Sequence, residues 1–186
     1  MMDEITLSRL LDEARSYFDE GKYLHAIQVY LRITGQDPSV EMAWIQLSHV
    51  YHELRRDDAA EEALIRALEV TDDREEILFL LGSLLLKGGK YSRALTYYKQ
   101  VLLSEPALSL TSRFHLHFNI GLTYFYRGNM RLAEIHFRRA RRLDPGFPKI
   151  NESLGELLLR RGAVSEAVVV LRRAVQVDPY SWIAHY

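Results

Sequence analysis

Residues 115–145 read HLHFNIGLTYFYRGNMRLAEIHFRRARRLDP, and this stretch decides the fold. Small and apolar residues recur at helical spacing from Ile120 to Tyr124, and again from Ala133 to Ala140. That spacing is typical of amphipathic helices. Gly128 interrupts the pattern between the two segments, as turns usually do. The stretch therefore predicts two amphipathic helices joined by a turn.

The same unit recurs along the whole chain at a nearly constant spacing. Three of the four intervals between the positions that close successive units (38 to 72, 72 to 106 and 145 to 179) are equal, at about 34 residues. The fourth interval, from 106 to 145, is longer by five. Such a period indicates stacked helical repeats, each of which buries its apolar stripes against its neighbours. We expect one domain over residues 1–186, with repeats at about 7–40, 41–74, 75–108, 109–147 and 148–181 and a partial further helix or cap at 180–186.

The composition excludes several classes of protein. Apolar residues make up 48% of the chain and charged residues 26%, which is typical of a soluble globular domain. The absence of cysteine excludes disulfides, thiolate catalysis and cysteine metal sites. The N-terminus has no basic and then apolar signal pattern, and the longest apolar run, Ile77–Leu86, is far shorter than the ~20 residues of a membrane span. We therefore expect a cytoplasmic protein without a membrane contact.

The charges are distributed unevenly between the two halves of the chain. Residues 1–93 contain 18 acidic and 11 basic residues (net −7), and residues 94–186 contain 7 and 13 (net +6). The arginines of the second half are interpreted as solvated outer faces of helices, or as the contact for an acidic partner or a second copy. We do not expect nucleic acid as a partner, because exposed aromatic residues are not interleaved with these arginines.

No group of residues has the spacing of a catalytic, cofactor or metal site. Gly88-Gly89-Lys90 lacks the spacing of a phosphate-binding loop and is interpreted as a turn between helices. His49 and His52 share a helix face, but no further ligand is spaced to complete a metal site. Glu156 is expected to pair with Arg160 one helical turn later. The chain is therefore not expected to be an enzyme.

The repeat resembles the tetratricopeptide repeat (TPR) family, whose unit of about 34 residues follows the pattern W-x2-L-G-x2-Y, then A-x3-F, then P. The resemblance covers about residues 6–179 and implies an all-α fold, a right-handed α-solenoid of helix-turn-helix repeats. The matching residues are Trp44, Leu47 and Tyr51, then Leu81 and Gly82, then Gly121, Tyr124, Ala133, Phe137 and Pro145.

Three local features follow from the repeat pattern. Small residues such as Gly121 are expected to let paired helices approach closely. The second copy lacks a turn glycine, and residues 58–61 instead resemble a capping box. The five extra residues before Gly121 either lengthen the next helix, with Ser109, Thr111 or Ser112 as its cap, or form a longer loop.

The family resemblance also implies a concave groove lined by the first helix of each repeat. At the matching positions the groove is apolar and aromatic in the middle, with histidines on one side and carboxylates near one end. The residues expected to line it are Leu11, Arg15, Phe18, Ile45, His49, His52, Phe79, Ser83, Leu86, His115, Phe118, Leu122, Phe125, Glu152 and Glu156.

An exposed aromatic strip usually marks a binding site. The sequence therefore favours a protein-interaction scaffold or adaptor that binds an apolar or amphipathic peptide segment, extended or helical, of an unidentified protein. If Phe79 and Phe118 instead pack between repeats, the strip disappears. The alternative functions are a self-assembling structural module and the docking region of a larger enzyme.

Overall fold

The computed structural model describes residues 3–177 of the chain, which contain ten α-helices, one short 3₁₀ helix and no strand. These elements divide into two compact units, residues 1–88 (unit 1) and residues 89–186 (unit 2). The expected helix or cap at 180–186 lies outside the described residues. The helices are α1 (Glu4–Asp19), α2 (Tyr23–Gln36), α3 (Glu41–Glu53), α4 (Asp57–Val70), α5 (Arg74–Lys87), α6 (Tyr91–Leu103), η1 (Glu105–Ala107), α7 (Leu110–Tyr126), α8 (Met130–Leu143), α9 (Pro148–Arg160) and α10 (Val164–Val177).

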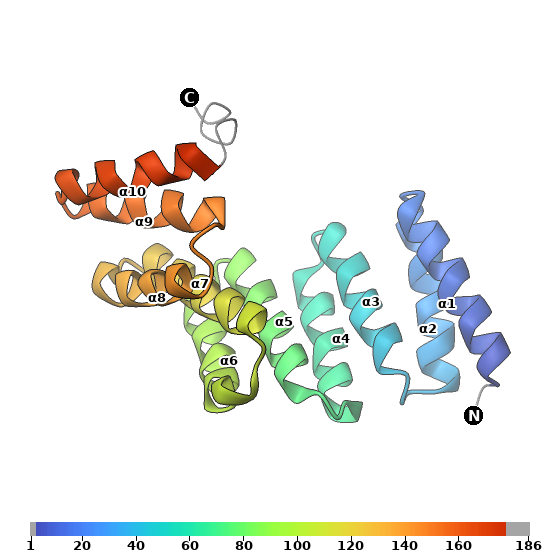
Figure 1. The fold of residues 1–186 in the computed structure, drawn as a ribbon. Coiled ribbons are helices and arrows are strands. Elements are labelled where there is room, and N and C mark those ends of the chain that lie inside the picture. The colour runs from blue at the N-terminus through green and yellow to red at the C-terminus, as the bar shows by residue number, and fades with distance from the viewer. Residues whose placement is uncertain (1–2, 178–186) are drawn as a thin grey trace. The chain divides into compact units, whose positions relative to one another are not determined.

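Unit 1 is a row of five helices, α1 to α5, in which each helix packs against the next one along the chain (Figure 1). Its core begins where Ala14 of α1 and Ala26 of α2, both 0% exposed, allow the two helices to approach closely. Tyr30 and Leu47 fill the space around this contact and are 2% and 1% exposed. The small and large residues predicted from the repeat thus pack together in one core.

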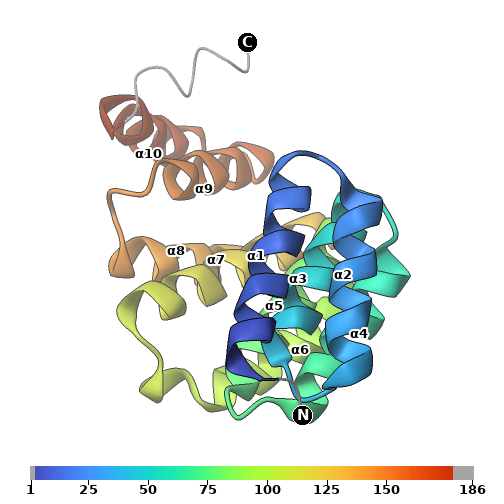
Figure 2. The same cartoon turned by 90° about the vertical axis from the view of Figure 1, so that its right-hand side faces the viewer.

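Unit 2 contains α6 to α10 and follows the same rule. Here α7 packs on both α6 and α8, and α9 packs on both α8 and α10; Figure 2 shows α9 and α10 as one antiparallel pair. The core is aromatic, because Phe114, Phe125 and Phe137 lie in one buried cluster with Leu154 and Leu158. The all-α, helix-turn-helix prediction is confirmed for both units.

Each short turn from an odd-numbered helix to the next even-numbered helix contains a residue in the left-handed backbone conformation. Glycine supplies it at four of the five turns, where Gly21, Gly89, Gly128 and Gly162 have φ between 70° and 85°, a region that glycine adopts without a steric penalty. The turn between α3 and α4 has Arg55 at this position instead, with φ 58°.

The start of α4 differs from the prediction. The helix begins at Asp57 and its N-cap is Arg56, which makes no side-chain capping hydrogen bond. Asp58 therefore lies within the first turn and is not the N-cap of a capping box. Asp57 contacts the preceding helix instead, because its Oδ1 lies 2.9 Å from Nδ1 of His52.

The five extra residues before the fourth repeat form both helix and connection. Part of the connection is the 3₁₀ helix η1, and α7 is 17 residues long, compared with 13 in α3 and α9 and 14 in α5. Ser109 caps α7, because its side chain accepts a hydrogen bond from the Ser112 backbone N–H at 3.0 Å. Ser109 is thus the cap among the three candidates.

Within residues 3–177, no helix combines the length and the hydropathy needed to cross a membrane.

Candidate functional site

The first three predicted groove residues come together in unit 1. Leu11, Arg15 and Phe18 of α1 face Met42 and Gln46 of α3 across a hollow of about 550 Å³. We call it the α1–α3 hollow. Its lining is Leu11, Asp12, Arg15, Phe18, Asp19, Tyr30, Met42 and Gln46.

The α1–α3 hollow combines apolar side chains with an excess of carboxylates. Asp12 and Asp19 are both exposed, and Arg15 is the single cation of its lining. Burial raises the pKa of the Tyr30 phenol, which therefore remains a neutral hydroxyl at neutral pH. Chemically, the hollow suits a ligand with an apolar side chain beside a positive charge.

The histidines of α3 line a second, smaller hollow in unit 1. His49 and His52 face Ser83 and Lys87 of α5 across a space of about 80 Å³. Desolvation, and then the charge of Lys87, lowers the pKa of His49. His52 is engaged by Asp57 at 2.9 Å. Among the described residues, no three His, Asp or Glu side chains are grouped as metal ligands.

The remaining predicted groove residues of unit 1 are less accessible. Ile45 is buried, with 7% of its surface exposed. Phe79 and Leu86 of α5 are half-buried. The predicted groove is therefore open mainly at α1 and α3.

In unit 2, two predicted groove aromatics are core residues. Phe118 is 8% exposed, and its ring centroid lies 5.7 Å from that of Phe147 and 6.0 Å from that of Phe137. Phe125 is 5% exposed and lies under the guanidinium of Arg160, 4.5 Å from the ring centroid. The expectation of an exposed aromatic strip is thus wrong at both positions, because residues of the following helix pair cover them.

The other predicted groove residues of unit 2 differ in exposure. His115 is exposed, with its ring 5.1 Å from that of Phe114, and Leu122 and Glu152 are half-buried. Glu156 accepts a hydrogen bond from Arg160 at 2.7 Å, which confirms the predicted ion pair.

Several lining residues of the α1–α3 hollow were not predicted. Asp12 and Gln46 each follow directly after a residue that was chosen, Leu11 and Ile45. Met42 comes from the first turn of α3, before the repeat motif begins. Including the residue after each chosen position would have added Asp12 and Gln46. The proximity of Met42 to α1 is visible only in the three-dimensional structure.

Unit 2 also contains a buried polar cluster that the sequence did not reveal. His117 is 1% exposed; its Nε2 lies 3.0 Å from Oε1 of Glu105 and its Nδ1 lies 3.0 Å from Nδ1 of His136. Burial, reinforced by the charges of His117 and Arg139, lowers the pKa of His136 to about 4. Because His117 is buried, we interpret this cluster as a structural link between η1, α7 and α8.

A second network joins the last two helix pairs. Glu134 of α8 is 6% exposed and forms ion pairs with Arg138 and with Arg161. Arg138 also donates a hydrogen bond to Glu166 of α10 at 3.1 Å. Arg138 was expected to face water or an acidic partner, but it connects α8 to α10 instead.

The comparisons with known proteins agree with this architecture. The sequence profile of the tetratricopeptide repeat family matches residues 11–74, 53–109 and 118–181. TPR repeat-containing protein MJ1428 of Methanocaldococcus jannaschii is 21% identical over 94% of this chain and 39% of its own length. General transcriptional corepressor ssn6 of Schizosaccharomyces pombe is 30% identical over 75% of this chain and 12% of its own length. The chain thus spans well under half of these relatives.

Solved structures share the fold. A crystal structure of MamA covers 100% of this chain and 99% of its own, with a TM-score of 0.77 at 19% identity. MamA residues 41 to the end from Desulfovibrio magneticus RS-1 reach a TM-score of 0.82 at 18% identity, covering 97% of this chain and 98% of that one. PilF of Pseudomonas aeruginosa matches 92% of this chain and 76% of its own, with a TM-score of 0.77 at 19% identity. At these identities the likeness concerns the fold, which is the α-solenoid of helix-turn-helix repeats.

Proposed function

The chain belongs to the tetratricopeptide repeat family, and from this premise we propose that it binds an apolar or amphipathic peptide segment of another protein in the α1–α3 hollow of unit 1. The TPR fold serves in general as a scaffold for protein–protein interaction, and its members are typically non-catalytic. We assign the chain no catalytic role.

The observation that carries this proposal is the size and lining of the α1–α3 hollow. Its volume of about 550 Å³ lies within the ~300–1,000 Å³ range of ordinary ligand pockets. Leu11, Phe18 and Met42 supply apolar contacts, while Asp12 and Asp19 outnumber the single Arg15. A segment with leucine-like side chains beside lysine or arginine fits this surface best.

Two labelled peptides with identical leucine positions test the charge preference, one flanked by lysines and the other by glutamates. We expect the α1–α3 hollow to bind the lysine peptide more tightly than the glutamate peptide, and fluorescence anisotropy measures the binding. The double substitution Asp12→Lys with Asp19→Lys should weaken binding of the lysine peptide by about tenfold or more, because two attractive charges become repulsive. The double substitution Glu62→Lys with Glu69→Lys, which reverses two exposed carboxylates of α4, is the matched control. Unchanged binding by the double variant would refute the proposal.

The apolar contact is tested in the same assay. Met42→Ser should weaken binding of the lysine peptide, because Met42 is 52% exposed at the hollow and loses its contact with the ligand. Leu24→Ser removes an apolar side chain that is 62% exposed on α2 and should leave binding unchanged. Substitution of Phe118 and Phe125 is unsuitable here, because both side chains are buried and their loss would destabilise the core of unit 2.

A further inference from the structure

The second helices of the five pairs begin at equivalent positions, which makes their exposed residues directly comparable. Residues 27, 61, 95, 134 and 168 all stand four residues after a helix start. Ile27, Glu61, Leu95 and Glu134 are 7%, 6%, 4% and 6% exposed, whereas Val168 of α10 is 42% exposed. A position that is buried in α2, α4, α6 and α8 is thus open, and apolar, in α10.

Three neighbouring apolar residues at the same end of unit 2 are also exposed. Val164 and Val175, which share a helical stripe with Val168, are 56% and 38% exposed. Leu159 of α9 is 47% exposed, although its equivalent one repeat earlier, Phe125, is 5% exposed. We call Leu159, Val164, Val168 and Val175 the α10 end face.

The preceding helix pair shows what covers such a face. Glu134 is covered by Arg161, which follows α9, and Phe125 is covered by Arg160 at the end of α9. Ile150 and Leu154 of α9 lie with Phe137 in the same buried cluster. Arginines at the C-terminal end of α9 thus cover Glu134 and Phe125, whereas apolar side chains of α9 cover Phe137. Because the α10 end face has valine and leucine where the preceding pair has Glu134 and Phe125, it fits a helix with an apolar stripe.

The charge beside the face indicates the chemistry of that helix. Arg172 is exposed and follows Val168 by one helical turn, and its equivalent one repeat earlier is Arg138. Arg138 reaches forward to Glu166 of the next helix pair at 3.1 Å. Arg172 is thus placed to pair with a carboxylate on whatever packs next.

We propose that the α10 end face docks an amphipathic helix of another protein, one that carries glutamate or aspartate beside its apolar stripe. Four exposed apolar side chains form the contact, and Arg172 selects an acidic flank. This surface is separate from the α1–α3 hollow, and its preferred ligand has the opposite charge.

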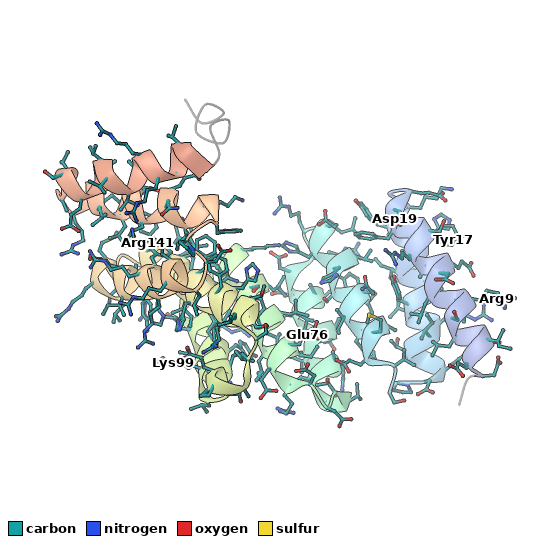
Figure 3. All side chains as sticks on the ribbon, viewed as in Figure 1. Arg9, Tyr17, Asp19, Glu76, Lys99 and Arg141 are labelled. Atoms are coloured by element: carbon teal, nitrogen blue, oxygen red, sulfur yellow. The ribbon has the colours of Figure 1, made fainter. Side chains whose placement is uncertain are left out.

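The first helix of a second copy does not fit the α10 end face. One repeat position in the first helices is fully buried from α3 onward: in α3, α5 and α9 it is occupied by Ala43, Ile77 and Ile150, each 0% exposed. The corresponding residue of α1 is Arg9, which is exposed and lies on the outer side of α1 (Figure 3). Docking α1 there would bury a guanidinium against valines, close to Arg172. Burial of such an unpaired charge is strongly unfavourable.

The test uses two labelled alanine-based helical peptides with leucine at i, i+4, i+7 and i+11, one flanked by glutamates and the other by lysines. The glutamate peptide should bind the full chain at the α10 end face, and Met42→Ser at the α1–α3 hollow should leave this binding unchanged. Val168→Glu and Arg172→Glu should not weaken binding of the lysine peptide, which the α1–α3 hollow accounts for. Val168→Glu and Arg172→Glu should each weaken the glutamate peptide by about tenfold or more. Fluorescence anisotropy measures both effects.

The chain offers a matched control for Val168→Glu. Val169 is 58% exposed, and its equivalents Glu62 and Ile135 in earlier repeats are exposed as well, so this position is not covered by a neighbouring helix. The Val169→Glu variant should therefore bind the glutamate peptide as tightly as the wild type does. In α4 and α8 the residues equivalent to Val168 are glutamates, Glu61 and Glu134. The Val168→Glu variant is therefore expected to fold, and circular dichroism verifies this.

Three results would overturn the proposal. The first is equal binding of the glutamate peptide by the wild type and by Val168→Glu. The second is a wild-type dimer in sedimentation equilibrium that Val168→Glu dissociates, because the occupant would then be a second copy. The third is binding that appears only in the Trp182→Ser, Ile183→Ser double variant, because residues 180–186 of the chain itself would then cover the face.

Discussion

The backbone of Gly121 in α7 lies directly against the ring of Phe137 in α8: a Cβ atom at position 121 would stand 2.4 Å from Phe137 Cδ1 and 2.6 Å from its Cε1. Phe137 is 0% exposed and lies in a buried cluster with Ala133 and Ile150, so a shift of its ring would displace packed neighbours. The same relationship recurs one repeat later, where a Cβ at Gly155 would stand 2.3 Å from Leu171 Cδ2. The absence of a side chain at these glycines thus sets the distance between paired helices.

Gly121→Ala is expected to lower the free energy of unfolding by about 1–3 kcal/mol, because overpacking forces α7 and α8 apart. Urea denaturation measures the change. Gly35→Ala is the control, because it also adds one methyl group to a helix, yet nothing lies within 4 Å of its Cβ. That substitution should stabilise by about 0.5–1 kcal/mol. Equal effects at both positions would contradict the packing argument.

Arg55→Gly is expected to raise the melting temperature. Arg55 has φ 58° at a turn position where four other pairs have glycine. A non-glycine residue there costs about 1–2 kcal/mol in steric strain, part of which the greater flexibility of unfolded glycine offsets. We expect a net gain of about 0.5–1 kcal/mol. Gly162→Ala is the reverse substitution and should lower the melting temperature.

Acidification should destabilise unit 2 through the histidine pair. The folded-state pKa of His136 is about 4, below its ordinary value of 6.5, and the pKa of His117 is also lowered, chiefly by burial. The unfolded chain therefore binds protons that the folded chain does not. The free energy of unfolding is therefore unaffected by this difference above about pH 6.5. It decreases as the pH falls toward 4, by up to about 3 kcal/mol for His136.

Urea denaturation at pH 7, 5.5 and 4.5 measures this loss. His136→Asn removes the titrating group and should reduce the difference in unfolding free energy between pH 7 and pH 4.5. The groups that face His136 are His117 of α7, Glu105 of η1 and Arg139 of α8, and they are unchanged in the variant. An identical pH dependence in wild type and variant would show that His136 does not govern it.

Glu134→Ala should be more destabilising than Glu156→Ala, although both residues pair with an arginine four positions later. Glu134 is buried and holds both Arg138 and Arg161, whereas the side chains of Glu156 and Arg160 are 55% and 54% exposed. We expect a loss of about 1–3 kcal/mol at Glu134 and below about 0.5 kcal/mol at Glu156. Thermal unfolding compares the two variants, and equal losses would contradict the role of burial.

Helix pairs were predictable because their signal is local. Ala133 and Phe137 are four residues apart on one face, so their spacing alone predicts both the helix and its buried side. The turn at Gly128 was predictable for the same reason, since glycine adopts its φ of 85° without a steric penalty. The start of α4 was not, because Asp57 pairs with His52 and no cap sequence encodes that contact.

The candidate site was predicted less completely. Leu11, Arg15 and Phe18 were predicted as groove residues from their positions within the repeat, and all three line the α1–α3 hollow. It could not show that Phe147 and Arg160 of the following helix pair cover Phe118 and Phe125. Exposure depends on the neighbouring repeat, whereas the motif describes a single repeat.

The sequence by itself determined the repeat, its period, the identity of the paired helices and the glycines at their contacts. These properties depend on backbone conformation and on side-chain volume within a single repeat. Only the tertiary structure decided which faces stay open. Phe118 and Val168 are both apolar residues, yet one is 8% exposed and the other 42%. The physical difference is a packed neighbour: α9 lies against the first, and no described helix lies against the second.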